Sequence, residues 1–149
     1  MHDLQALKAT LARIKAAEAP SRKIDAEIAE LLWPETTRRL PFNGELYTKQ
    51  HLTGDISAAV ALVKHVLPGW AYEIWHGYGA SQAVLIPNRD DPAHSARLLA
   101  EFPELPNEED DRLYWIFDEK RLSQDQEALS VCQALLTGMI KIAKWKAET

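Results

Sequence analysis

The sequence has little cysteine, little glycine and no long apolar run: its 149 residues include one cysteine and six glycines. A single cysteine, Cys132, excludes a disulfide within the chain and favours a reducing compartment. It falls on the apolar face of a predicted helix, so we interpret it as a small buried hydrophobe and not as a reactive thiol. No segment approaches the roughly 18 to 20 apolar residues that a membrane span requires, so we expect a cytoplasmic protein with no membrane partner.

An excess of positive charge is also lacking, because 17 Lys and Arg face 22 Asp and Glu and the formal net charge is -5. Sequence-independent binding to nucleic acid draws most of its affinity from cations that neutralise phosphates, so the charge argues against a nucleic-acid partner. Linkers rich in Gly, Ser or Pro are absent, as are internal repeats. We therefore expect one domain over residues 1–149, large enough to bury a core of its own.

Motifs for catalysis and metal binding are missing as well. The five histidines are scattered, with no HExxH or cysteine-rich spacing, and no GxSxG elbow occurs. Asp90, Asp91 and His94 come nearest to a metal cluster, and residues 108–111 lack the glycine and spaced ligands of a calcium loop. Residues 77–79 precede a predicted strand, which favours a hairpin turn over a phosphate loop. We expect no enzyme activity, no metal and no cofactor.

What the chain does contain begins with two amphipathic segments. Apolar residues at three- and four-residue spacing predict a helix over residues 3–18 with Asp3 as its N-cap. A second helix starts after Ser21 and ends before Pro34. Residues 1–33 are therefore predicted to form a helical hairpin, packed outside the core or used for assembly. The following residues 34–54 show no sustained period, and we read them as an irregular connector with at most one short hairpin.

Residues 55–149 are predicted to form the core of the fold. A helix with Ile56, Ala59 and Val63 on its buried face ends at Pro68-Gly69. Alternating residues then predict a strand from Trp70 to His76. Three further segments are expected to follow it: a pairing strand over 81–87, a short helix over 92–101 and a third strand over 112–118.

The last segment predicts the longest helix, with Ser123 as its N-cap and a broad apolar face that includes Cys132. A complementary polar stripe consists of Gln126, Ser130, Gln133, Thr137, Lys141 and Lys144. Together these segments predict an α+β fold in which an antiparallel sheet of three or more strands is sandwiched between helices (α-β-α).

Three segments resemble, in order, a family of small phage and prophage proteins, the phage ABA-sandwich domain family. They are SRKIDAEIAELL, the central YT…DISAAVALVKHVLPGW and the C-terminal ALSVCQALLTGMIKIA. The resemblance implies an antiparallel sheet that lies between helices. It also implies that the protein acts in the cytoplasm of an infected or lysogenic bacterium. The family as a whole has no established activity, so the resemblance supplies no catalytic residues. The inserted KQHLTG separates the YT pair from the central helix, so nothing about residues 34–54 is carried over from the family.

Aromatic and cationic side chains supply the residues that we expect at a ligand site. Trp75 would point away from the face that carries Trp70 and Tyr72, and we favour core packing for it, because a sheet between helices is buried on both faces. The alternative is a stacking surface with arginine forks that bind phosphate. That site would consist of Arg38, Arg39, Lys49, Trp75, His76, Tyr78 and Arg89.

Two functions follow as hypotheses. In the first, the chain is a non-enzymatic phage or prophage accessory protein that binds and sequesters a small nucleotide-type immune signal, by analogy with other phage proteins. In the second, it is a protein-protein interaction module, either an inhibitor of a host protein or an assembly accessory. A homo-oligomer is expected in either case, favoured by an apolar seam left exposed on the N-terminal hairpin.

Overall fold

The computed structural model describes residues 3–87, 117–123 and 125–148, which form four helices and two antiparallel sheets. The elements in chain order are α1 (Leu4–Ala16), α2 (Arg22–Leu32), the short 3-10 helix η1 (Pro34–Thr36), β1 (Thr37–Arg39), β2 (Leu46–Thr48), α3 (Ile56–Val66), β3 (Trp70–Gly77), β4 (Ala80–Pro87), β5 (Phe117–Arg121) and α6 (Glu127–Glu148). The predicted helix over 92–101 and the acidic segment 108–111 lie outside the described residues. No described helix is both long and apolar enough to cross a membrane.

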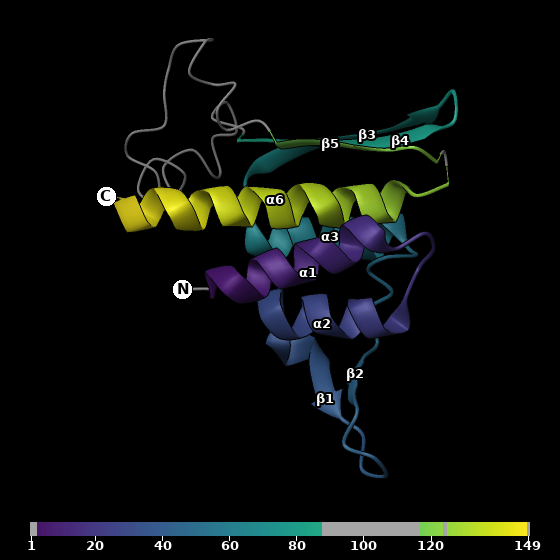
Figure 1. The fold of residues 1–149 in the computed structure, drawn as a ribbon, viewed down its shortest axis with the longest axis vertical. Helices are drawn as coiled ribbons and strands as arrows, with labels where there is room; N and C mark the ends of the chain where they lie inside the picture. Colours follow the sequence, from purple (N-terminus) through teal and green to yellow (C-terminus); the bar gives the residue numbers. More distant parts are fainter. Residues whose placement is uncertain (1–2, 88–116, 124, 149) are drawn as a thin grey trace.

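The predicted N-terminal helical hairpin is confirmed, and so are both of its caps. Asp3 Oδ1 accepts a hydrogen bond from the amide of Gln5 at 3.0 Å, and Ser21 Oγ accepts one from Ile24 at 3.2 Å. α1 packs against α6, and α2 lies on the other side of α1 (Figure 1). Leu7 is fully buried in the core by this packing. The apolar seam of α1 is thus covered within the chain, so it is not a free surface for assembly.

The three-stranded sheet has the order β3-β4-β5 and is antiparallel throughout. Gly77 pairs with Ala80, and the two residues between them, Tyr78 and Gly79, have φ angles of 51° and 71°. Positive φ at both central positions is the geometry of a type I′ turn, whose twist matches the flanking strands. The predicted hairpin turn is therefore confirmed. The third strand continues to Arg121, three residues beyond its predicted end.

α6 lies in the middle of the molecule, between the three-stranded sheet on one side and α1 and α3 on the others (Figure 1). Because neighbours surround it, even its predicted polar stripe is largely covered: Ser130 and Gln133 are buried. Gln133 Nε2 donates to Glu119 Oε2 of β5 at 2.9 Å, and Thr137 Oγ1 donates to Glu119 Oε1 at 2.8 Å. The stripe is therefore an internal polar seam between α6 and β5.

The predicted start of α6 is wrong, because the helix begins at Glu127 and not after Ser123. The cap comes from β4 instead. Ser81 Oγ accepts a hydrogen bond from the Gln126 amide at 3.0 Å and donates one to the carbonyl oxygen of Ser123. A side chain distant in sequence thus replaces the local cap that the sequence predicted.

The prediction that Trp75 packs in the core is also wrong, since this residue is 44% exposed. Leu85 and Phe117 stand on the face of the sheet that packs against α6, and Trp75 belongs to the opposite face, in register with Gln82 and Lys120. In the described ranges all four helices lie on the other side of this sheet (Figure 1). Two residues expected in the core, Ile56 and Tyr72, are also exposed by about two fifths, at 42% and 40%.

The predicted α+β class, with its antiparallel sheet and N-terminal helical hairpin, is confirmed. The helices lie between the three-stranded sheet and a small second sheet formed by β1 and β2, which projects at the far end (Figure 1). This second sheet is the one short hairpin expected within residues 34–54. It is attached to the core chiefly through α2.

Candidate functional site

The projecting β1–β2 hairpin is built from a short register of three pairs, Thr37 with Thr48, Arg38 with Tyr47 and Arg39 with Leu46. Its tip is closed by backbone bonds from Leu40 N to Glu45 O at 2.8 Å and from Gly44 N to Leu40 O at 2.9 Å. Gly44 has a φ angle of 68°, which glycine adopts without strain.

Phe42, at this tip, is 98% exposed, so its ring buries almost no apolar area within the chain.

A buried polar network fixes the base of the hairpin to α2. Asp25 is only 1% exposed, and its Oδ1 accepts hydrogen bonds from the amide and the hydroxyl of Thr53 at 2.7 and 2.6 Å. Its Oδ2 accepts one from Arg22 Nη1 at 2.8 Å. Arg22 also donates to the carbonyl oxygens of Thr48 and, at 3.0 Å, Gln50. These bonds join α2, the end of β2 and the segment before α3 into one rigid unit.

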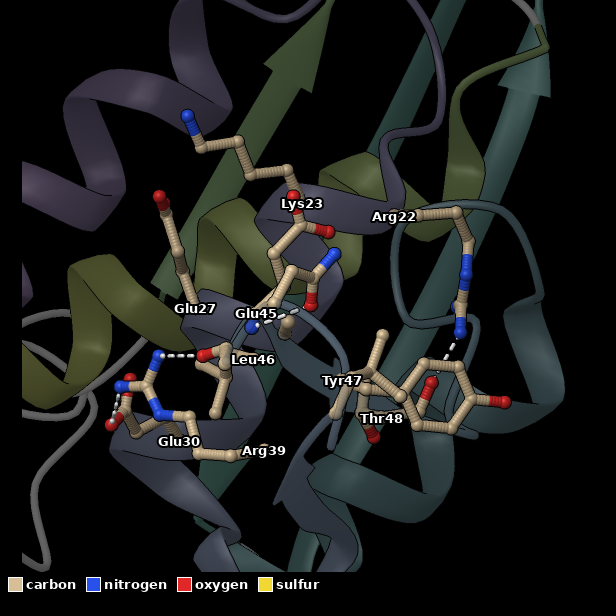
Figure 2. A pocket seen from close by; sticks show the side chains of 13 residues that line it. Arg22, Lys23, Glu27, Glu30, Arg39, Glu45, Leu46, Tyr47 and Thr48 are labelled. Carbon is tan, nitrogen blue, oxygen red and sulfur yellow. Dashed lines mark hydrogen bonds and ion pairs between the residues drawn. The ribbon is translucent and has the colours of Figure 1, made fainter.

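Between α2 and the hairpin lies a cavity of about 740 Å³ (Figure 2). The cations on its wall are Arg22, Lys23 and Arg39, the carboxylates are Glu27, Glu30 and Glu45, and the remaining lining is Ala26, Leu40, Asn43, Gly44, Leu46, Tyr47 and Thr48. A volume in this range suits a small molecule or a few side chains of a peptide.

Most of the cavity's charge is already paired. Arg39 Nη2 lies 3.5 Å from Glu30 Oε1, and its Nη1 donates to the carbonyl oxygen of Gly44 at 3.2 Å (Figure 2). Arg13 Nε binds Glu27 Oε2 at 2.5 Å from the neighbouring helix. Since Arg22 is held by Asp25, Lys23 is the cation of this lining for which the described residues show no ion pair. The cavity therefore presents balanced charges and not a concentrated positive field.

The structure does not bring the predicted site residues together. Arg38 and Arg39 lie on β1 with Lys49 just after β2, whereas Trp75, His76 and Tyr78 lie at the β3–β4 turn (Figure 1). The two hairpins lie at opposite ends of the molecule, and Arg89 lies outside the described residues.

The aromatic group at the β3–β4 turn is itself divided between different surfaces. Trp75 faces away from α6, whereas His76 Nδ1 lies 3.0 Å from Glu127 Oε1 at the start of that helix. Tyr78 is fully exposed at the turn. The stacking surface predicted from these three residues therefore does not form in the chain.

Among the predicted cations, Arg38 has an aromatic partner. Its guanidinium carbon lies 5.3 Å from the centre of the Tyr47 ring, and that of Arg22 lies 5.9 Å from the same ring. These distances are within the range of cation–π attraction. The arginine and tyrosine side chains of the hairpin are thus held by one another.

Sequence reasoning missed Asp25, Arg22 and Tyr47 as members of this site. A signal for Asp25 was present, because it shares a helical face with Ile28, Ala29 and Leu32, all buried. A carboxylate in an apolar stripe needs a buried partner, which here is Thr53 together with Arg22. Where those partners would come from could not be read from residue spacing.

A second cavity of about 430 Å³ lies beside the end of α1 and is lined in part by Lys15, Glu18, Lys120 and Arg121. The donors of Arg121 are used inside the protein: Nη1 bonds the Ile14 carbonyl at 2.9 Å and Gln133 Oε1 at 2.8 Å, and Nε bonds Gln126 Oε1 at 2.7 Å. Burial lowers the pKa of this guanidinium. Its role is structural, because it joins the end of α1 to β5 and α6.

The cysteine and the metal expectations can also be placed. Cys132 is fully buried, and its thiol donates to the carbonyl oxygen of Leu52 at 3.2 Å, which confirms the core interpretation. Within the described ranges no group of three or more His, Cys, Asp or Glu side chains is arranged to hold a metal ion. Asp90, Asp91 and His94 lie outside those ranges.

The fold and the cavity define a small α+β protein with a projecting hairpin and a charge-balanced cavity at its base. Comparison with protein-family models, with curated proteins and with solved structures gave no significant match.

Proposed function

We propose that this chain is a non-enzymatic accessory protein that binds a protein partner through the β1–β2 hairpin and the adjoining cavity. The observation that carries this proposal is Phe42, a 98% exposed aromatic side chain at the tip of a hairpin that is fixed to α2. Aromatic side chains on rigid supports lose little conformational entropy on binding and are enriched among the residues that dominate interface energies.

The electrostatics of the cavity support a polypeptide over a phosphate-rich ligand. Its three cations and three carboxylates offset one another, and Arg39 is already engaged by Glu30. A polyanion would have to displace that carboxylate from Arg39 and leave Glu30 and Glu45 facing its own charge. A peptide segment with both acidic and basic side chains would meet complementary groups along the same wall.

A nucleotide-type ligand is the second candidate, and one observation favours it. Arg38 lies over Tyr47 on the hairpin, so a base could stack at this place beside a guanidinium that binds phosphate. The separation of this pair from Trp75 and Tyr78 counts against the larger site expected from the sequence.

The proposed biological setting rests on the sequence resemblance to phage and prophage proteins. A phage or prophage accessory protein that inhibits a host protein, or assists assembly, is the form of the proposal that agrees with both the resemblance and the hairpin surface. In that setting the protein acts in the cytoplasm of the bacterial host.

The test is site-specific photocrosslinking in bacterial cells, with a benzophenone amino acid placed at position 42. Position 78 is the matched control, because Tyr78 is also a fully exposed aromatic at a turn tip but lies on the other hairpin. We expect position 42 to crosslink a discrete protein other than this chain, and position 78 to crosslink no such protein. The same protein should co-purify with the unmodified chain and be lost on Phe42→Ala.

Two results would contradict the proposal. One is equal crosslinking from both positions, which would mean that any exposed aromatic ring reacts. The other is retention of the partner by Phe42→Ala. If cyclic or linear nucleotides raise the unfolding temperature, and Arg38→Ala or Tyr47→Ala abolishes the increase, the nucleotide-binding function is favoured instead.

A further inference from the structure

The outer edge of β3 is a separate feature, distant from the β1–β2 hairpin. In the order β3-β4-β5, β3 is paired with β4 on one side, and among residues 3–87, 117–123 and 125–148 no strand lies on its other side. An edge of this kind presents a row of backbone donors and acceptors to whatever strand can reach it.

The register identifies the backbone groups on this edge. Gly77 and Ala80 close a two-residue type I′ turn, so they exchange both backbone hydrogen bonds. Hydrogen-bonded and non-bonded pairs then alternate along the hairpin. The amides and carbonyls of Trp75 and Glu73 therefore point toward β4, and those of Tyr72, Ile74 and His76 point outward.

Within its own residues, this strand lacks three devices that usually prevent pairing. β3 contains no proline and no lysine, and its one-to-one register with β4 leaves no bulge. Two large side chains of the strand, Tyr72 and Trp75, are 40% and 44% exposed on opposite faces of the sheet. Such a strand has the backbone groups and the apolar flanks that an added strand would cover.

We propose that β3 pairs with β3 of a second copy of this chain, antiparallel and centred on Ile74. In that register Ile74 meets Ile74 and Tyr72 meets His76 of the second copy, so all three outward residues of each strand find partners. Glu73 meets Trp75, and no like charges stand opposite each other. A register centred on Glu73 would set two carboxylates face to face, and it would require the Trp70 amide, which already donates to Leu67 O at 3.1 Å.

The side-chain pairs of this register favour a second copy as the occupant, because Glu73 meets no carboxylate and the exposed Tyr72 and Trp75 of each strand are partly covered by the other. Each outward residue is matched by a residue of the same strand, which is the requirement of an isologous two-fold interface. Opposite residues in this register stand on the same face of the sheet, so α6 of both copies lies on one side. The two three-stranded sheets then become one continuous sheet.

Amide hydrogen exchange on the full-length chain, together with native mass spectrometry, tests this proposal. We expect a dimer mass, and protection of the amides of Ile74 and His76 as well as those of Glu73 and Trp75. In a monomer only the amides of Glu73 and Trp75 are protected, because only these two bond to β4. A monomer, or a dimer in which Ile74 and His76 exchange rapidly, would overturn the proposal.

Two variants of one exposed residue separate backbone pairing from side-chain contact. Tyr72→Pro removes an outward amide without removing a bond to β4, and edge strands tolerate proline at such positions. It should weaken dimer association by at least about tenfold, because the amide is lost in both copies. Tyr72→Ala keeps the amide and should remain largely dimeric. Dimers of equal strength in both variants would show that another surface holds the copies together. If Tyr72→Pro does not fold, the exchange pattern of the unmodified chain decides alone.

Discussion

At the scale of single residues, Ser81 controls where α6 begins. Its hydroxyl accepts from the Gln126 amide at 3.0 Å and donates to the Ser123 carbonyl, so it satisfies one donor and one acceptor at the helix start. Free backbone groups at a helix start need such partners, and a side chain from another element can supply them as well as a local cap.

This arrangement predicts opposite outcomes for two serines. Ser81→Ala should lower the free energy of unfolding by about 1 kcal/mol, because it removes both bonds at the start of α6. Ser123→Ala should change it by less than about 0.5 kcal/mol, since only the backbone of Ser123 is used. Urea denaturation of the two variants measures both changes. A larger loss of unfolding free energy in Ser123→Ala than in Ser81→Ala would show that Ser123 caps α6, as the sequence predicted.

Cys132 gives a prediction about pH. Burial, with a smaller contribution from the charge of Asp25, raises the pKa of its thiol above the ordinary value. A raised pKa in the folded state means that the unfolded chain releases this proton first as pH increases. The thiol's contribution to stability is therefore present below pH about 8.5 and is lost as pH rises above it.

The measurement is the free energy of unfolding from pH 7 to pH 10 for the chain and for Cys132→Ala. The variant is expected to be less stable at pH 7, because it leaves a small cavity in the core. Above pH about 8.5 the stability of the unmodified chain should fall relative to the variant by up to about 1.4 kcal/mol per pH unit. If the difference in unfolding free energy between the two proteins stays constant from pH 7 to pH 10, the pKa of the Cys132 thiol is not raised by folding.

At the scale of elements, the contact between α6 and the sheet depends on Gly138. A Cβ at this position would overlap the ring of Phe117, which is itself stacked on Trp70 with ring centres 5.2 Å apart. Glycine inside a helix costs about 1 kcal/mol relative to alanine, so its presence here is explained by close packing and not by helix propensity. The helix gives up intrinsic stability to let β5 approach.

Gly138→Ala should therefore destabilise the protein by about 1 kcal/mol, because overpacking typically costs about 1 to 3 kcal/mol and exceeds the gain in propensity. In a Phe117→Leu background the same change should be neutral or stabilising. A double-mutant cycle followed by thermal and urea unfolding measures the coupling. Stabilisation by Gly138→Ala alone would mean that the ring of Phe117 does not lie against Gly138.

At the scale of the whole molecule, the elements could be predicted from sequence and their long-range contacts could not. Apolar period and capping residues predicted the helices that follow Asp3 and Ser21, and turn residues predicted the hairpin at residues 77–79, because these signals lie within a few residues of the structure they specify. The prediction that Arg38 and Trp75 share one site is wrong, because their distance depends on how two separate hairpins are placed in the fold. The exposure of Trp75 failed for the same reason.

Arg121 is the clearest of these long-range contacts. It lies on β5, is almost fully buried, and donates to the carbonyl oxygens of Ile14 and Ala17 at the end of α1, more than a hundred residues earlier in the chain. Those carbonyls form the negative end of the α1 dipole, so they offset part of the cost of burying a cation. The bonds to Gln126 and Gln133 connect the same guanidinium to α6.

Arg121→Lys should therefore loosen the N-terminal hairpin from the core. A single ammonium cannot reach acceptors on both helices, so about 2 kcal/mol of stability is expected to be lost, with buried acceptors left unpaired. Lys120→Met is the matched control, because its exposed side chain lies on the opposite face of β5. Hydrogen exchange should show the loss of protection first in residues 10–16 of α1, ahead of α6 and the sheet. Uniform loss throughout the chain would show that Arg121 supports the whole core and not this one junction.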